Sequence, residues 1–149
     1  METNNTLSKW QSQMIVDAFQ GGLVSYEEVK TFINDVSKEK KQAVLVFGAN
    51  WCPDCQILAG LIKYYQKLDS INQAFTFLLI NVENYEINMD LLLKLDPSAQ
   101  LGIPRLFIFD IDRNIINLDR NDFFRTVRSM NENALIEYLN LFKNLKQPF

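Results

Sequence analysis

The chain has 149 residues, of which 48% are hydrophobic and 22% are charged, so it is long enough to bury a core as one globular domain. A formal net charge of −3 gives no electrostatic reason to expect a nucleic acid or an anionic membrane as partner. No stretch approaches the ~20 apolar residues of a membrane span. The sequence has no histidine, which excludes Ser-His and Cys-His nucleophiles and any His-ligated metal site.

The N-terminal residues carry charges at Glu2, Lys9 and Asp17 and lack a continuous apolar segment. We therefore read no signal peptide and expect a cytoplasmic protein, or a periplasmic one if the sequence is a trimmed mature form. We expect residues 1–22 to be an extension, helical from 8 to 20 and stopped by the following glycine pair. Residues 23–149 are then the main domain.

The next elements follow from capping patterns and apolar spacing. Ser25 followed by Glu28 is a capping-box pattern that predicts a helix ending near Lys38. The apolar run Ala43–Phe47 predicts a strand buried on both faces, as in a parallel sheet. Apolar spacing then predicts, in chain order, a helix over 53–68, a strand over 74–82, a helix over 89–95 and strands over 105–110 and 115–118.

The turn residues Asp112-Arg113-Asn114 make the last two strands an antiparallel hairpin. Behind them, Ser129 and Glu132 form a second capping-box pattern, which predicts the start of the last helix. The apolar face of this helix carries Leu135 and Leu139. The element order predicts an α/β fold.

The only two cysteines, Cys52 and Cys55, stand two residues apart behind a buried strand and Trp51. On the first turn of a helix their Cβ atoms are roughly 5–6 Å apart, and a small adjustment gives the ~3.8 Å of a disulfide. A reversible dithiol is the favoured interpretation. An inert disulfide closing so small a loop would constrain the unfolded chain little. Zinc needs four ligands, and two cysteines without histidine do not supply them.

The motif Trp51-Cys52-Pro53-Asp54-Cys55, with Gly102-Ile103-Pro104 some fifty residues on, resembles the thioredoxin family. The element order matches that family from about residue 26 to residue 146. The resemblance implies a thioredoxin-like fold, a four-stranded mixed sheet flanked by helices, with a cis Ile103–Pro104 bond that faces the dithiol. The Cys-Pro-Asp-Cys version differs from ordinary thioredoxins, whose inner pair is Gly-Pro.

Three positions depart from the family pattern. Val46 stands where thioredoxins usually carry a buried Asp, and Leu79 where a Lys often accompanies it. The pair that assists proton transfer from the second cysteine is therefore missing. Arg105 follows the expected cis-proline, where Thr is often found, and could change the choice of substrate.

The site chemistry follows from these positions. Cys52 at the helix N-cap is the expected nucleophile, because free backbone N–H groups of the first turn stabilise a thiolate. Cys55 is the expected second thiol, which displaces the reduced product from a mixed disulfide. We expect Asp54, the nearest acid in sequence, to lie exposed and to accept the proton of Cys55. The expected substrate-binding residues are Trp51, Pro53, Ile103, Pro104 and Arg105.

The sequence thus predicts a thiol–disulfide oxidoreductase, most simply a reductase of protein disulfides. We expect no cofactor beyond the Cys52–Cys55 pair and no metal. The expected partners are disulfide-bearing proteins and a flavoprotein reductase or other thiol donor, with the chain itself a monomer. Two alternatives remain: a non-catalytic interaction module with the same fold, and an oxidase or isomerase of exported proteins.

Overall fold

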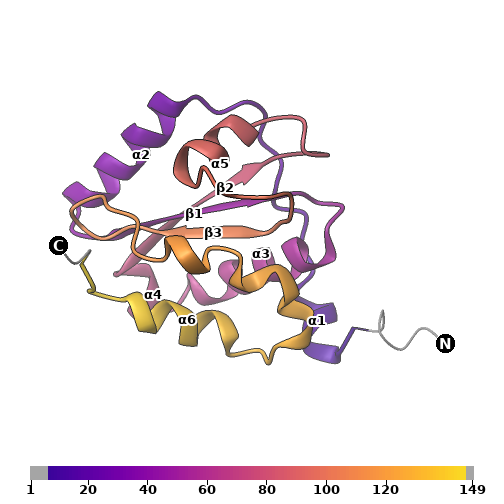
Figure 1. Ribbon diagram of the computed structural model, residues 1–149. Coiled ribbons are helices and arrows are strands. Elements are labelled where there is room, and N and C mark those ends of the chain that lie inside the picture. Colours follow the sequence, from indigo (N-terminus) through magenta and orange to yellow (C-terminus); the bar gives the residue numbers. More distant parts are fainter. Residues whose placement is uncertain (1–6, 147–149) are drawn as a thin grey trace.

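The protein, seen in a computed structural model that describes residues 7–146, is built around a mixed β-sheet with helices on both faces (Figure 1). Residues 1–6 of the expected extension lie outside the described residues. Strand β1 (Gln42–Gly48) is central, between β2 (Phe75–Asn81) and β3 (Arg105–Ile108). Every residue of β1 is buried, because helices cover both faces of this strand and a neighbour pairs with each edge.

The predicted parallel pairing of β1 and the mixed character of the sheet are confirmed. Strand β2 runs parallel to β1, and β3 runs antiparallel to it, so the sheet is mixed. Val44 has Phe77 beside it on one side and Ile108 on the other. Because β1 and β2 are parallel, their carboxyl ends lie at the same end of the sheet. The chain leaves β1 there and enters the helix that carries the cysteines.

The predicted fourth strand, residues 115–118, is wrong: the described residues form a three-stranded sheet. Ile115 makes only an isolated antiparallel bridge to Phe109. The side chain of Asn117 then takes the place of a strand, accepting the Ile108 N–H at 2.7 Å and donating to the Leu106 carbonyl oxygen at 2.8 Å. The 3-10 helix η2 (Leu118–Arg120) follows directly. A side-chain amide therefore satisfies two of the backbone groups on the outer edge of β3.

Helices α2 (Tyr26–Lys38) and α5 (Met89–Leu95) cover one face of the sheet, and α3 (Pro53–Tyr65) and α6 (Ala134–Phe142) cover the other (Figure 1). The capping box at the start of α2 forms as predicted, and α5 has the predicted bounds. Helix α3 ends three residues early and is followed by the short α4 (Asp69–Asn72).

The second predicted capping box does not form. Ser129 is the last residue of the 3-10 segment η3 (Phe123–Ser129), and its hydroxyl donates to the Thr126 carbonyl oxygen at 2.8 Å. Helix α6 begins five residues later, behind an Asn133 that makes no side-chain cap. The apolar face of α6 is where the spacing placed it, with Leu135 and Leu139 fully buried.

The N-terminal segment is less helical than predicted. Helix α1 spans only Lys9–Met14, and residues 15–24, here called the N-terminal strap, have no regular secondary structure. The backbone of Met14 packs against Gly60 so closely that a Cβ at Gly60 would overlap the Met14 carbonyl. This explains the glycine inside α3. The strap then passes the carboxyl ends of β1 and β2, where Asn81 and Asn88 donate to the carbonyl oxygens of Gly21 and Gly22.

Candidate active site

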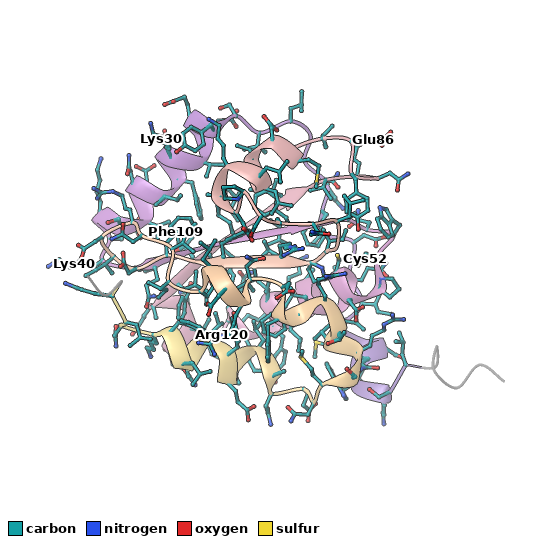
Figure 2. The ribbon with its side chains drawn as sticks, viewed as in Figure 1. Lys30, Lys40, Cys52, Glu86, Phe109 and Arg120 are labelled. Atoms are coloured by element: carbon teal, nitrogen blue, oxygen red, sulfur yellow. The ribbon has the colours of Figure 1, made fainter. Side chains whose placement is uncertain are left out.

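The two cysteines lie where β1 ends and α3 begins. Cys52 has extended backbone angles and is the N-cap of α3, with Pro53 at the first helical position. Proline suits that position because its missing N–H would have no helical partner there. Figure 2 shows Cys52 at one end of the molecule, far from Lys40, which precedes β1. Both cysteines are free thiols.

Cys52 is placed as a nucleophile. Its Sγ accepts a hydrogen bond from the backbone N–H of Cys55 at 3.2 Å. The hydrogen bond from the Cys55 thiol is the main cause that lowers the pKa of Cys52, against the opposing effects of burial and of the Asp54 charge. A lowered pKa increases the thiolate fraction near neutral pH. The thiol also lies 3.8 Å from the carbonyl oxygen of Ile103, which places the sulfur against the loop before β3.

Cys55 is placed as a protected second thiol. Its side chain has no exposed surface, since it lies one turn inside α3 between the helix and β1. Burial raises the pKa of the Cys55 thiol strongly, and the hydrogen bond and negative charge of Cys52 raise it further. The pair therefore combines one thiol that ionises readily with one that keeps its proton. Such asymmetry suits a nucleophile and a later-acting thiol.

Asp54 is not the exposed carboxylate that the sequence suggested. It is 7% exposed, and its Oδ1 accepts hydrogen bonds from the Arg128 backbone N–H at 3.0 Å and from Arg128 Nε at 3.2 Å. Arg128 lies 74 residues further on, in η3, so no local pattern indicates this partner. The Asp54 charge raises the pKa of both thiols. Whether it accepts a proton from Cys55 stays a prediction.

Trp51 and Pro53 are exposed on the two sides of Cys52. The Trp51 side chain is 54% exposed, yet it is held in place: its Nε1 donates to the Glu83 carbonyl oxygen at 2.7 Å. Its ring meets Tyr85 edge to face at 5.8 Å between centroids. Burial and the negative charge of Cys52 raise the pKa of Tyr85. Sequence reasoning missed Tyr85, which no motif marks.

The loop before β3 forms the opposite side of the site. The Ile103–Pro104 peptide bond is cis, and both side chains are buried. Gly102 has a φ of +141°, and the Arg125 guanidinium lies directly against it, in the space that a side chain would need. The loop thus directs the Ile103 carbonyl oxygen toward Cys52. Because the Ile103 and Pro104 side chains are buried, the loop contributes mainly backbone atoms to this side of the site.

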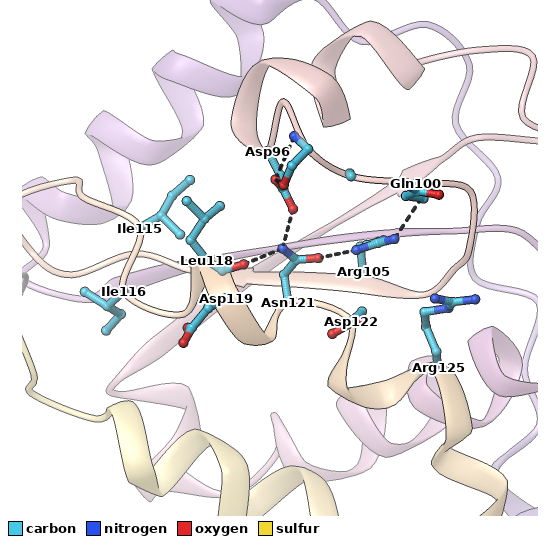
Figure 3. Close-up of a pocket in the computed structure, with 12 residues that line it drawn as sticks. Asp96, Gln100, Arg105, Ile115, Ile116, Leu118, Asp119, Asn121, Asp122 and Arg125 are labelled. Atoms are coloured by element: carbon cyan, nitrogen blue, oxygen red, sulfur yellow. Dashed lines mark hydrogen bonds between the residues drawn. The ribbon is translucent and has the colours of Figure 1, made fainter.

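Arg105 supports this loop from behind. Its guanidinium donates to the carbonyl oxygens of Gly102 at 3.0 Å and Gln100 at 2.8 Å, and to Asn121 Oδ1 at 3.0 Å. Asn121 in turn donates to Asp96 at 2.9 Å, so a buried polar chain runs behind the loop (Figure 3). This chain lines a pocket of about 630 Å³. The buried position of Arg105 indicates a supporting role, and a direct contact with substrate stays a prediction.

Two of the three positions that depart from the family pattern are neighbours across the sheet. Val46 of β1 and Leu79 of β2 are partners in the parallel register. Val46 is fully buried, so an apolar pair occupies the region where an acid and a lysine were expected. Cys55 therefore has no carboxylate from the sheet to take its proton.

Membrane-spanning and metal-binding features are absent from the part of the chain that the structure describes. No helix within residues 7–146 is both long enough and apolar enough to cross a membrane. Over the same residues, no three His, Cys, Asp or Glu side chains gather in a way that could hold a metal ion.

Comparisons with known proteins agree with this fold. A family model described as Thioredoxin matches residues 7–137. The crystal structure of a disulphide isomerase from Xylella fastidiosa superposes with a TM-score of 0.74 at 22% identity, covering 85% of this chain and 97% of that one. A protein of unknown function from Pseudomonas aeruginosa gives 0.41 at 19% identity, covering 75% of this chain and 65% of that one, a similarity too low to bear on the fold. No curated protein matched.

Proposed function

Since this chain belongs to the thioredoxin family, we propose that it is a thiol–disulfide oxidoreductase that reduces disulfides in proteins through Cys52 and Cys55. The observation that carries the proposal is the asymmetry of the pair. Cys52 sits at a helix N-cap with a lowered pKa, and Cys55 lies fully buried with a raised pKa, its backbone N–H 3.2 Å from Cys52 Sγ.

The reaction has two steps. The Cys52 thiolate attacks one sulfur of a substrate disulfide, and the other substrate sulfur leaves as a thiolate that takes up a proton. Cys55 then loses its proton and attacks Cys52 Sγ, and the electron pair of the broken bond leaves with the second substrate sulfur. The substrate gains two electrons, and the Cys52–Cys55 pair becomes a disulfide. A flavoprotein reductase or another thiol donor must reduce that disulfide again.

The substrate would lie across the apolar edge made by Trp51, Pro53 and the Ile103-Pro104 loop. Trp51 and Pro53 offer exposed apolar surface, and the loop provides backbone groups that an extended peptide can pair with. A cytoplasmic location and a monomeric state accompany this proposal as predictions.

Trapping experiments test the roles of the two thiols. Cys55→Ser should accumulate a mixed disulfide through Cys52, because the second step is lost, and Cys52→Ser should accumulate none. Mass spectrometry of the protein after incubation with a disulfide-bonded substrate measures both. Reductase activity that survives Cys52→Ser would overturn the proposal.

Isomerisation, the activity for which the Xylella protein is named, is the second candidate. Isomerisation rearranges substrate disulfides without net reduction, so a free substrate thiol can release Cys52 and Cys55 is dispensable. A Cys55→Ser variant that still reactivates a scrambled disulfide protein would favour this candidate. A reductase needs both cysteines, so in that case the same Cys55→Ser variant should lose its turnover.

A further inference from the structure

The N-terminal strap reaches the buried side of the cysteine pair. Phe19, in the middle of the strap, is 1% exposed and is among the largest fully buried side chains. Its backbone N–H donates to Asn50 Oδ1 at 2.9 Å, and its carbonyl oxygen accepts from Asn50 Nδ2 at 3.0 Å. Asn50 directly precedes Trp51 and Cys52. Two hydrogen bonds from a single amide therefore fix the strap to the active-site loop.

The Phe19 ring lies against the space next to Cys55. A Cβ built on Gly48, the last residue of β1, would stand 2.6 Å from Phe19 Cζ and 3.1 Å from Cys55 Sγ. The tip of the ring and the sulfur thus lie next to the same small volume. They can approach it this closely because Gly48 has no side chain. The strap thus supplies an apolar wall beside Cys55.

Contacts on both sides of Phe19 hold the strap in register. Gln56 of α3 donates to Asp17 Oδ1 at 2.9 Å. Further along, Asn88 accepts the Val24 N–H at 2.9 Å and donates to the Gly22 carbonyl oxygen at 3.0 Å. The strap on both sides of Phe19 is therefore held by residues of α3, of the loop after β1 and of the N-cap of α5.

We propose that Phe19 is a positioning residue for the second step of the reaction: its ring keeps water from the Cys55 thiol, so that this thiol reacts with the mixed disulfide at Cys52 and with little else. The inference rests on the proposed function and adds a role for the strap. The Cys55 proton leaves on the side of Cys52, where the mixed disulfide lies, and the departing substrate sulfur takes up a proton. The Cys52–Cys55 bond forms as the bond to substrate breaks.

Removal of the ring should hydrate Cys55 and make it reactive toward an external reagent. Each unit by which hydration lowers the pKa of a thiol gives about tenfold more thiolate. The weaker basicity reduces nucleophilicity by about threefold per unit, which leaves a net gain of about threefold. In a Cys52→Ser background, Phe19→Ala should therefore raise the rate of Cys55 alkylation by iodoacetamide at least about threefold at pH 7. The pH midpoint of alkylation should fall.

Two milder variants keep the test valid if Phe19→Ala does not fold. Phe19→Leu retains an apolar side chain but shortens the wall, and Asn50→Ala removes the two anchoring hydrogen bonds without altering the ring. Both should raise the alkylation rate and lower its pH midpoint, whereas Leu23→Ala is the matched control, because Leu23 is 79% exposed in the same strap. Circular dichroism checks that each variant is folded. Folded variants with the parent's rate and midpoint would overturn the inference.

A second readout separates this inference from the proposed function. In a Cys55→Ser background, adding Phe19→Leu should leave the rate at which Cys52 forms a mixed disulfide unchanged within about twofold. Failure of Cys52 to form any mixed disulfide would overturn the proposed function itself. Normal mixed-disulfide formation, with Cys55 reactivity indifferent to residue 19, would overturn only the role of the strap.

Discussion

Asp54 is the residue at which the site departs most from its sequence-based interpretation. Its negative charge disfavours both thiolates, while its Oδ1 is bound by the backbone and the side chain of Arg128. Part of the carboxylate charge is therefore neutralised by the guanidinium of Arg128, whose side chain is 39% exposed. The pKa of Cys52 therefore depends on how completely Arg128 neutralises the Asp54 carboxylate.

Opposite shifts in the pKa of Cys52 should follow when either partner is replaced. Asp54→Asn removes a negative charge, so the pKa should fall, by up to about one unit, and the thiolate should appear at lower pH. Arg128→Gln leaves the carboxylate uncompensated, so the pKa should rise. The ultraviolet absorbance of the thiolate, followed against pH, measures both. Shifts of the same sign in the two variants would contradict this account of the charges.

The same pair of variants tests proton transfer. If Asp54 accepts the proton of Cys55, Asp54→Asn should slow release of the reduced substrate even though it favours the thiolate. General base catalysis typically contributes ~10²–10⁴-fold, and a carboxylate already bound to Arg128 should give the low end or less. Stopped-flow measurement of substrate release gives the rate. A release rate unchanged or faster at pH 7 would leave the proton to solvent.

At the scale of single residues, most of the site could be predicted from local motifs. The N-cap position of Cys52, the burial of Cys55 and the place of the Ile103-Pro104 loop follow from residues within a few positions of each motif. The missed residues, Arg128, Tyr85 and Phe19, all contact the site from distant segments. Long-range contacts of this kind have no periodic or spacing signal in a single sequence.

Among the elements, the region after β3 shows how a strand prediction fails. Residues 115–118 read Ile-Ile-Asn-Leu after a turn, which is a reasonable strand pattern. In the structure, Asn117 is fully buried and also donates to the Tyr138 hydroxyl at 3.0 Å, besides its two hydrogen bonds to β3. A polar residue inside an apolar run can belong to a strand, or its side chain can bond to the neighbouring strand in place of one. Strand propensity does not distinguish these two cases.

Asn117→Ala should destabilise the fold by about 2–4 kcal/mol, because it leaves the Ile108 N–H and the Leu106 carbonyl buried without partners. Asn114→Ala is the matched control, since Asn114 is exposed in the preceding turn. Urea unfolding at equilibrium gives the free energy of each variant. A cost below about 1 kcal/mol for Asn117→Ala would show that water or a shifted backbone replaces the amide.

Across the whole molecule, the N-terminal segment belongs to the packing of the core. Phe19 is in the main hydrophobic cluster, and α1 packs on α3 through the Met14–Gly60 contact. The family model also begins at residue 7. The sequence showed a weakly periodic segment that ends in two glycines, which suggested an appended helix. Its packing follows from partners on three other elements, which the segment itself does not reveal.

Deletion of residues 1–22 should lower the unfolding free energy substantially. Loss of one buried Phe side chain alone typically costs about 3–5 kcal/mol, a large part of the ~5–15 kcal/mol that holds a domain folded. Urea unfolding of the shortened chain beside the full chain measures the loss, with Leu23→Ala in the full chain as control. An unchanged midpoint would mean that residues 23–149 are a self-sufficient domain, as the sequence predicted.

The closure of the β3 edge has a consequence for contacts between molecules. The outward-facing groups of β3 are all occupied: Leu106 by Asn121 and Asn117, and Ile108 by Asn117 and Ile116. An open strand edge is a template on which a second chain can add and begin to aggregate. Most sheets guard an edge with a neighbouring strand, a bulge or a charge, whereas here one side-chain amide occupies two of the four groups and the backbone of Asn121 and Ile116 occupies the other two. Replacement of Asn117 would therefore leave two backbone groups of the β3 edge available for pairing with a second chain.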